Sequence, residues 1–191
     1  MNALPKPMSL DEFLAWEERQ ELRYEFDGAR VVDRLSGTAA HSTIGTNFLV
    51  AVHSRLRNPL FWVVGSNLKL LTGAGTIRYP DAMVLRDRYE PSATVVESAV
   101  VVLEVLSEET SRVDRIDKAR EYEATPSVQR YVMLEQEAPQ AVVYRRDGDR
   151  WTHDILLADA ILAMPEIGVE FPLAELYEGL SFEAEPEPEP A

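Results

Sequence analysis

The sequence predicts an α/β or α+β fold, in which a mixed β-sheet is flanked by helices and extended by additional antiparallel strands. Helix-type apolar spacing alternates along the chain with strand-type segments. Residues 99–106 form a nearly continuous apolar run, which is typical of a central strand covered on both faces. The 191 residues suit one compact domain, and the hydrophobic share of 46% argues against bulk disorder.

The first segment predicts a helix followed by a hairpin. Ser9, with Glu12 three residues later, has the pattern of a capping box, so a helix is expected over residues 9–18. An Asp-Gly pair stands between two alternating segments, residues 22–26 and 29–32. Because both residue types tolerate the positive φ of a tight turn, these segments are predicted to form a hairpin.

The middle of the chain predicts a second helix and several strands. Apolar residues recur at every fourth position over residues 42–56, which indicates a helix. Runs rich in β-branched and other apolar residues predict strands over residues 61–64, 68–71 and 77–85. A polar stretch that contains a proline, residues 86–97, is expected to be a surface loop.

The second half of the chain predicts the centre of the sheet and its far edge. The apolar run over residues 99–106 is the expected central strand, and a helix is predicted over residues 112–124. Three further segments are expected to close the fold as antiparallel strands, at residues 130–134, 141–144 and 151–156.

These elements predict one domain over residues 9–180, between an N-terminal arm (1–8) and a tail (181–191). The tail alternates Glu and Pro and is expected to be disordered, because it cannot bury apolar area. No apolar run approaches the roughly 20 residues that span a bilayer, and no apolar signal core follows the N-terminus. A cytoplasmic protein without a membrane partner is therefore expected.

The formal net charge of −14 argues against a nucleic-acid partner, because phosphate binding draws its affinity from Lys and Arg. Four glutamates in the tail carry four of these charges, which leaves −10 for the body. A nucleic-acid contact would need a local basic patch or the help of a partner. Cysteine is absent, so a metal must be held by oxygen or imidazole ligands, which favours Mg²⁺ or Mn²⁺.

Two carboxylates are the leading candidates for chemistry. Glu104 interrupts the most hydrophobic strand, and burying a lone carboxylate costs roughly several kcal/mol unless it is paired, protonated or bound to a cation. Pairing with an arginine explains Glu104 equally well on composition alone. Asp81 follows Pro80, which indicates a bulge or a strand edge there. If the two strands are neighbours, both carboxylates can hold one divalent ion.

Lys118, one of only three lysines, lies in the helix that follows the Glu104 strand. The simpler interpretation is a solvated side chain paired with Asp114 one turn earlier, because Ile116 and other apolar residues cluster opposite Lys118 on the helical wheel. Against this, Tyr122 shares the face of Lys118 and is a large residue to leave in water.

Two more polar residues have a simple explanation when taken alone. Glu25 alternates with two aromatic residues and fits a solvated strand face. His41 opens the second predicted helix, where a capping or exposed histidine is expected.

Short motifs along the chain occur in a characteristic order and spacing. They are Tyr24-Glu25-Phe26-Asp27-Gly28, His41-Ser42, Pro80-Asp81, Glu104-Val105-Leu106-Ser107, and then Thr110, Asp114, Lys118 and Tyr122. Together they resemble the Uma-type restriction endonucleases of bacteria, a branch of the PD-(D/E)XK nuclease superfamily. The resemblance runs from about residue 8 to residue 179 and includes C-terminal motifs at residues 165–168 and 172–177.

The resemblance implies a restriction-endonuclease-like mixed sheet with a divalent metal at Asp81 and Glu104. The superfamily pattern has a lysine two residues after the second carboxylate, where this chain has Leu106. The Uma-type branch is similar to this chain in that the lysine has moved to the following helix, here Lys118. A long ammonium side chain can reach the same point in space from another backbone position.

The same resemblance implies that Glu25 borders the site and supplies a further carboxylate, with His41 and Tyr122 as accessory residues. The expected function is Mg²⁺- or Mn²⁺-dependent hydrolysis of DNA phosphodiester bonds. Two alternatives stay open: an inactive nuclease-fold module for binding or regulation, suggested by the acidic surface and by Leu106, and a hydrolase of a small phosphodiester. A homodimer would suit cleavage of two strands, although no residue demonstrates one.

Overall fold

The computed structural model of the chain describes residues 6–34, 37–87, 90–106 and 112–182, with only the backbone at residues 112–114. Most of the N-terminal arm and of the tail predicted to be disordered lies outside the described residues. So do Ser107 and Thr110 of the family motif and the side chain of Asp114. Within the described part, no helix has both the length and the apolar character needed to cross a membrane.

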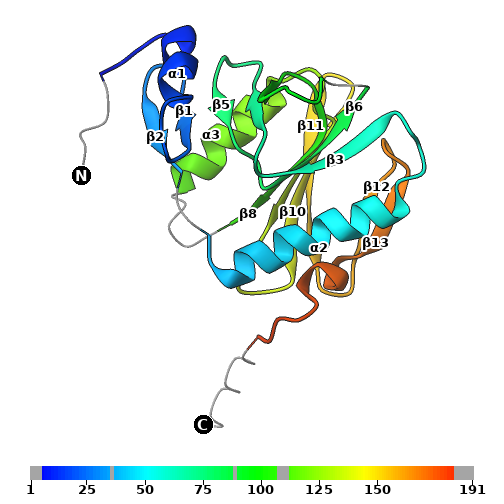
Figure 1. The fold of residues 1–191 in the computed structure, drawn as a ribbon. Helices are drawn as coiled ribbons and strands as arrows, with labels where there is room; N and C mark the ends of the chain where they lie inside the picture. The colour runs from blue at the N-terminus through cyan, green and yellow to red at the C-terminus, as the bar shows by residue number, and fades with distance from the viewer. Residues whose placement is uncertain (1–5, 35–36, 88–89, 107–111, 183–191) are drawn as a thin grey trace.

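A six-stranded mixed sheet lies at the centre of the molecule (Figure 1). From one edge to the other its strands are β11 (Arg150–Leu157), β10 (Gln140–Asp147), β9 (Arg130–Leu134), β8 (Ala99–Val105), β6 (Ala82–Arg86) and β3 (Phe61–Gly65). Only the β8–β9 pair is parallel, and every residue of β8 is buried. The central strand, the mixed sheet and the antiparallel set β9–β10–β11 are therefore confirmed.

A smaller five-stranded sheet lies beside the N-terminal helix (Figure 1). Its strands, in order, are β2 (Val31–Asp33), β1 (Tyr24–Phe26), β5 (Ile77–Arg78), β4 (Lys69–Leu71) and β7 (Val95–Val96). The predicted hairpin is formed by β1 and β2, and Gly28 adopts a φ of 95° in its turn, a conformation that favours glycine. Strand β7 lies within the stretch predicted to be loop only.

Within the described residues three α-helices accompany the sheets, and all three were predicted. Helix α1 (Leu10–Glu17) begins with the predicted capping box, in which Ser9 and Glu12 bond each other's backbone N–H. Helix α2 (Ala39–Arg55) lies on one face of the large sheet and α3 (Arg112–Glu123) on the other (Figure 1). A hairpin of β12 (Ile161–Met164) and β13 (Val169–Pro172), followed by the 3₁₀ helix η1 (Leu173–Tyr177), completes the α2 side.

The strand predicted over residues 77–85 is wrong in one respect, because the structure divides it into β5 and β6. Pro80 lies between them, and proline has no N–H to donate to a ladder. Strand β5 pairs within the small sheet and β6 within the large sheet. Asp81 therefore lies at the junction of the two sheets.

The two faces of β8 contact different parts of the core. Val101, Leu103 and Val105 contribute to the cluster that contains α2 and the C-terminal hairpin. Val102 contributes to the cluster on the α3 side. Because side chains alternate along a strand, Glu104 shares the α3 side with Val102.

Replacement of Gly73 tests how closely α3 must approach the small sheet. Gly73 follows β4, and a Cβ atom at this position would lie 2.2 Å from the carbonyl oxygen of Ala124. Gly73→Ala is expected to lower the free energy of unfolding by about 1–3 kcal/mol, because backbone must move to relieve the overlap. Urea unfolding at equilibrium measures this loss.

Gly45→Ala is the matched control, since a Cβ at this position in α2 meets no described atom within 4 Å. It is expected to gain about 0.5–1 kcal/mol from the better helix propensity of alanine. Equal unfolding free energies for the two variants would contradict the close approach at Gly73.

Candidate active site

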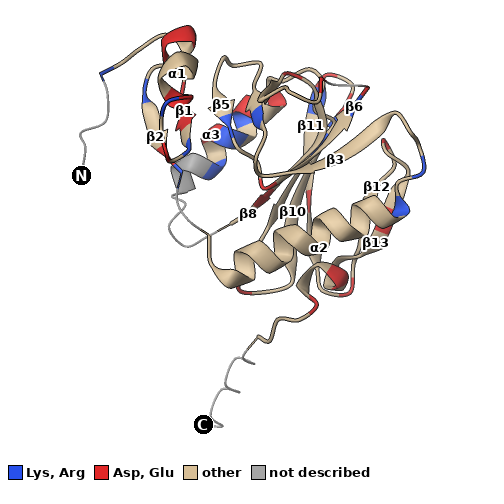
Figure 2. Ribbon diagram, in the orientation of Figure 1, with Lys and Arg blue, Asp and Glu red and all other residues tan. Residues whose placement is uncertain are grey.

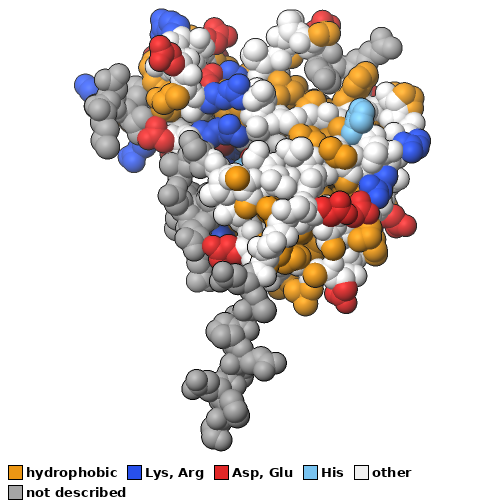
Figure 3. Space-filling view, turned by 60° about the horizontal axis from the view of Figure 1, so that its bottom comes forward, with side chains coloured by type: hydrophobic (Ala, Val, Ile, Leu, Met, Phe, Trp, Pro, Cys, Tyr) orange, Lys and Arg blue, Asp and Glu red, His pale blue; other side chains and the backbone are white. Residues whose placement is uncertain are grey.

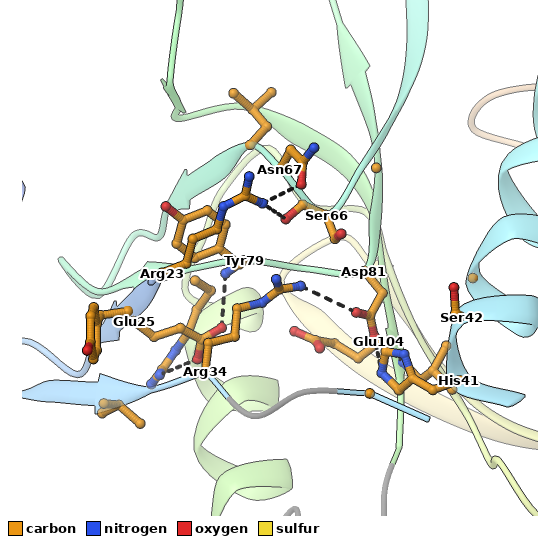
Figure 4. A pocket seen from close by; sticks show the side chains of 18 of the residues that line it. Arg23, Glu25, Arg34, His41, Ser42, Ser66, Asn67, Tyr79, Asp81 and Glu104 are labelled. Carbon is orange, nitrogen blue, oxygen red and sulfur yellow. Dashed lines mark hydrogen bonds and ion pairs between the residues drawn. The ribbon is translucent and has the colours of Figure 1, made fainter. Parts of the chain in front are cut away.

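A cleft of about 1420 Å³ opens where α2, the β1–β2 hairpin, the β5–β6 junction and α3 meet (Figure 4). Five of the residues singled out in the sequence line it: Glu25, His41, Asp81, Glu104 and Lys118. The sixth, Tyr122, is fully buried beneath the cleft and bonds Glu104. Side chains up to 97 positions apart in the sequence thus meet in one place.

Asp81 is held at the start of β6 by the backbone of β8. Its N–H donates to the carbonyl oxygen of Leu103 at 3.0 Å, and its Oδ2 accepts from the N–H of Val105 at 2.8 Å. The β6–β8 register pairs Ala82 with Leu103, so Asp81, directly before β6, lies next to Glu104 of β8, and both residues line the cleft. The expectation that the two carboxylates occupy neighbouring strands is met.

Glu104 is 7% exposed and accepts two hydrogen bonds on Oε1. One comes from the hydroxyl of Tyr122 at 2.7 Å and the other from Nζ of Lys118 at 3.1 Å. Burial raises the pKa of Glu104, and the nearby carboxylates of Asp81 and Glu25 raise it further, against the opposing effect of Lys118. The site therefore concentrates negative charge, an arrangement that favours a bound cation.

Lys118 reaches into the cleft from α3, with its side chain only 16% exposed. Its Nζ lies 3.8 Å from Oε1 of Glu25 in addition to its bond to Glu104. Burial lowers the pKa of Lys118, but the two carboxylates outweigh burial and raise it overall. The side chain is therefore an ammonium ion at neutral pH.

The helical wheel favoured a solvated Lys118, and that interpretation is wrong. Ile116, expected on the buried face of the helix, is 45% exposed, whereas Tyr122 on the face of Lys118 is fully buried. The reason is that α3 presents polar side chains to a buried charged cluster, where Glu121 bonds Arg78 through both carboxylate oxygens at 2.6 Å. In α3, therefore, the position of Ile116 does not mark the face of the helix that contacts the rest of the protein.

Glu25 is buried and does not belong to a solvated strand face. Its Oε1 accepts from the N–H of Tyr79 at 3.0 Å, and its Oε2 accepts from Nη1 of Arg78 at 3.1 Å. Burial raises the pKa of Glu25, but the charges of Lys118 and Arg78 and the bond from Tyr79 lower it overall. Glu25 is thus a carboxylate with both oxygens engaged by the protein.

His41 lies in the first turn of α2 and serves neither as its cap nor as an exposed residue. Thr38 is the cap, and its hydroxyl accepts the backbone N–H of His41 at 3.1 Å. Nε2 of His41 lies 3.1 Å from Oδ2 of Asp81. This hydrogen bond raises the pKa of His41 against the effect of burial. His41 therefore orients Asp81 from the α2 side.

Arg34 and Tyr79 also line the cleft, and the sequence pointed to neither. Nη2 of Arg34 lies 3.8 Å from Oδ1 of Asp81 (Figure 4). Tyr79, with Arg78, immediately precedes the Pro80-Asp81 pair. Arg78 stands between the apolar Ile77 and the aromatic Tyr79, and this charge within a predicted strand is a signal that could have identified it.

The donor set fits a divalent cation that retains part of its water shell. Asp81 and Glu104 present oxygen ligands to the same cleft. No three Asp, Glu or His side chains in the described ranges converge as a complete metal cage. Mg²⁺ in proteins commonly uses one or two carboxylates together with several waters, so two carboxylates suffice for it.

Two curated relatives are similar to this chain over most of their length, and both come from Synechocystis sp. The "Uncharacterized protein slr1290" is 28% identical over 179 residues, which cover 92% of this chain and 94% of the relative. The "Uncharacterized protein sll1609" is 24% identical over 154 residues, covering 78% of this chain and 86% of the relative.

A solved structure has the same fold. It is described as "a putative nuclease belonging to DUF820" from Anabaena variabilis and matches with a TM-score of 0.75 over 90% of this chain and 98% of its own. The sequence identity of 17% shows a shared fold only. The restriction-endonuclease-like fold expected from the sequence is therefore confirmed.

The model of the Uma2 family, described as "Putative restriction endonuclease", matches residues 10–174. This match contains every described site residue and nearly all of the fold. The chain belongs to the Uma2 family of restriction-endonuclease-like proteins.

Proposed function

We propose that the protein hydrolyses phosphodiester bonds of DNA with a divalent ion, Mg²⁺ or Mn²⁺, held by Asp81 and Glu104. One observation carries the proposal: the two carboxylates adjoin on paired strands in the cleft, and Nζ of Lys118 lies 3.1 Å from Glu104. When bound, such an ion lowers the pKa of a coordinated water and polarises a phosphoryl oxygen.

Lys118 acts as a fixed positive charge. Its raised pKa keeps it protonated, so it donates hydrogen bonds and does not accept a proton at neutral pH. From its place beside Glu104 it can donate to a phosphoryl oxygen, where negative charge increases in the transition state. Glu25 and Glu104 hold the ammonium from two sides, and Glu25 is therefore a positioning residue in this proposal.

The neighbours of Asp81 leave one of its oxygens directed to the cleft. Oδ2 is occupied by Val105 and His41, whereas Oδ1 has only the longer contact to Arg34 at 3.8 Å. Tyr122 likewise fixes Oε1 of Glu104. Substrate and cation thus meet carboxylates that are already oriented, which avoids reorganisation during the reaction.

Two features of the structure would help a polyanion to approach the cleft of this acidic protein. Helix α2, which lines the cleft with Thr38, His41 and Ser42 at its N-terminal end, contains no Asp or Glu (Figure 2). Basic side chains gather where the N-terminal hairpin meets the body of the molecule (Figure 3). These two features favour DNA as the substrate within an overall acidic protein.

Two other functions make different use of the same cleft. A binding or regulatory module is favoured by the net charge of −14 and by Leu106 at the usual lysine position. Such a module would hold no ion through Asp81. A hydrolase of a small phosphodiester would meet less repulsion, and it would cleave such a compound faster than DNA.

Asp81→Asn tests the metal site directly. It keeps the size of the side chain and is expected to reduce Mg²⁺-dependent DNA cleavage by at least about 100-fold, since several kcal/mol of charge stabilisation are lost. Calorimetric titration with Mn²⁺ is expected to show binding to the natural protein and none to the variant. Mn²⁺ at a concentration of 100 times its Kd should also raise the free energy of unfolding of the natural protein by about 2.7 kcal/mol. The variant should show no such stabilisation.

Asp154→Asn is the control for Asp81→Asn, because Asp154 pairs with Arg145 at 2.9 Å where both side chains are half exposed. It is expected to match the natural protein in both assays. Equal Mn²⁺ binding by Asp81→Asn and the natural protein would contradict the metal site and favour the regulatory module.

Lys118→Met tests the role of the ammonium. It is expected to lower kcat by about 10²- to 10³-fold with little change in KM, because the donor acts in the transition state. Mn²⁺ affinity should be kept or increased, since a neighbouring positive charge is removed. Loss of the buried partner should also destabilise the fold by about 3–5 kcal/mol. Steady-state kinetics, Mn²⁺ titration and urea unfolding measure these effects.

Lys118→Arg is a second variant that keeps the charge if Lys118→Met does not fold, and it should retain more activity. The exposed Lys6 gives the control Lys6→Met, for which no change is expected. Unchanged kcat in a folded Lys118→Met protein would remove Lys118 from the proposed mechanism.

A further inference from the structure

Two arginines share one aromatic platform at the mouth of the cleft (Figure 4). The guanidinium carbon of Arg23 lies 5.7 Å from the centre of the Tyr79 ring, and that of Arg34 lies 5.4 Å from the same centre. Arg23 comes from the segment before β1 and Arg34 from the residue after β2. The hairpin therefore brings both cations to one ring.

The platform is fixed at both ends. The hydroxyl of Tyr79 donates to Oε1 of Glu17 at 2.7 Å, and Nζ of Lys69 binds the other oxygen of Glu17 at 2.7 Å. At the backbone, the N–H of Tyr79 donates to Glu25 at 3.0 Å. All four residues are buried, so the ring has a defined position on which the guanidinium groups can stack.

The charges of these two arginines are largely uncompensated within the described residues. Arg23 bonds the carbonyl oxygen of Ser66 and the side-chain oxygen of Asn67, and it forms no ion pair there. Arg34 has one carboxylate contact, to Asp81 at 3.8 Å. By contrast, Arg78 binds Glu121 through two short bonds. The two arginines thus retain donors for an anion.

We infer that Arg23 and Arg34, stacked on Tyr79, form a subsite for backbone phosphates that flank the reacting phosphodiester of a DNA strand. The inference rests on the proposed function and adds where the strand lies. Guanidinium groups suit phosphate because their planar donors bind two oxygens at once. The two distances to the ring place the guanidinium carbons at most about 11 Å apart, so both can contact the backbone of one strand.

A purely structural role for the arginines predicts a different behaviour. In that case they would only cover the Tyr79 ring, and their loss would affect folding without affecting nucleic-acid binding. Other acidic residues that line the cleft, Glu21, Asp27 and Asp33, form no ion pair with either arginine among the described residues. Replacing each arginine with glutamine separates the two roles. Glutamine removes the positive charge but keeps much of the apolar stem that covers the Tyr79 ring.

The test is binding of a fluorescently labelled DNA duplex in EDTA, followed by anisotropy over a range of salt concentrations. Arg23→Gln and Arg34→Gln are each expected to reduce the slope of log K against log salt by about 1, and the double variant by about 2. Arg57→Gln is the matched control, since Arg57 is exposed, bonds only backbone carbonyls among the described residues and lies outside the cleft.

Several results would overturn the subsite. They are an unchanged slope in the double variant, an equal reduction in Arg57→Gln, and no binding of DNA by the natural protein. A loss of binding that only follows a lower melting temperature would assign the arginines to folding instead. The nuclease proposal is separable, because Asp81→Asn should lose cleavage in Mg²⁺ yet keep its affinity for DNA in EDTA. Full cleavage by the double arginine variant would likewise leave the nuclease proposal intact and reject the subsite.

Discussion

The site depends on one ammonium group buried between carboxylates of two different sheets. Glu25 belongs to the small sheet and Glu104 to the large sheet, and Lys118 contacts both from α3. A buried ion pair contributes little net stability, because desolvation offsets attraction, but removing one partner leaves a costly lone charge. The arrangement therefore fixes where the two sheets and α3 stand relative to one another, and it does so at the point where the cleft opens.

The same charge cluster explains why part of the site could be predicted from the sequence and part could not. Glu104 was identifiable because a carboxylate in a wholly apolar strand needs a partner, and the partner is nearby. The spacing of apolar residues could not show that Lys118 belongs to the site, because α3 directs charged side chains inward and leaves Ile116 exposed. The usual inference from apolar periodicity assumes an apolar interface, whereas α3 buries charged side chains beside the apolar contacts of Ala119 and Tyr122. Family resemblance, which carries no such assumption, selected Lys118.

The remaining differences between the sequence-based predictions and the structure arise from contacts between segments that are separated along the chain. The alternating pattern of residues 77–85 is that of one strand, and only tertiary pairing shows that β5 and β6 belong to different sheets. The proline between them was a sign of irregularity, but its consequence depends on which strands pair on either side of it. Arg23 and Arg34 had no local signal at all, because arginines on either side of a hairpin are ordinary until a distant Tyr79 meets them.

Net charge and local charge have separate consequences in this protein. The value of −14 describes the whole chain, including a tail that carries four of the charges, and exposed charges are screened beyond about 10 Å at moderate ionic strength. In the proposed function, a DNA strand would meet the cleft, where the wall formed by α2 has no carboxylate and the mouth has two arginines on a fixed ring. Carboxylates from other elements do line the cleft, and Asp81 and Glu104 are the two to which the proposed cation would bind. If the proposed function holds, an acidic surface would limit unspecific binding while contacts in the cleft hold a phosphate backbone, because long-range repulsion and short-range contacts act at different distances.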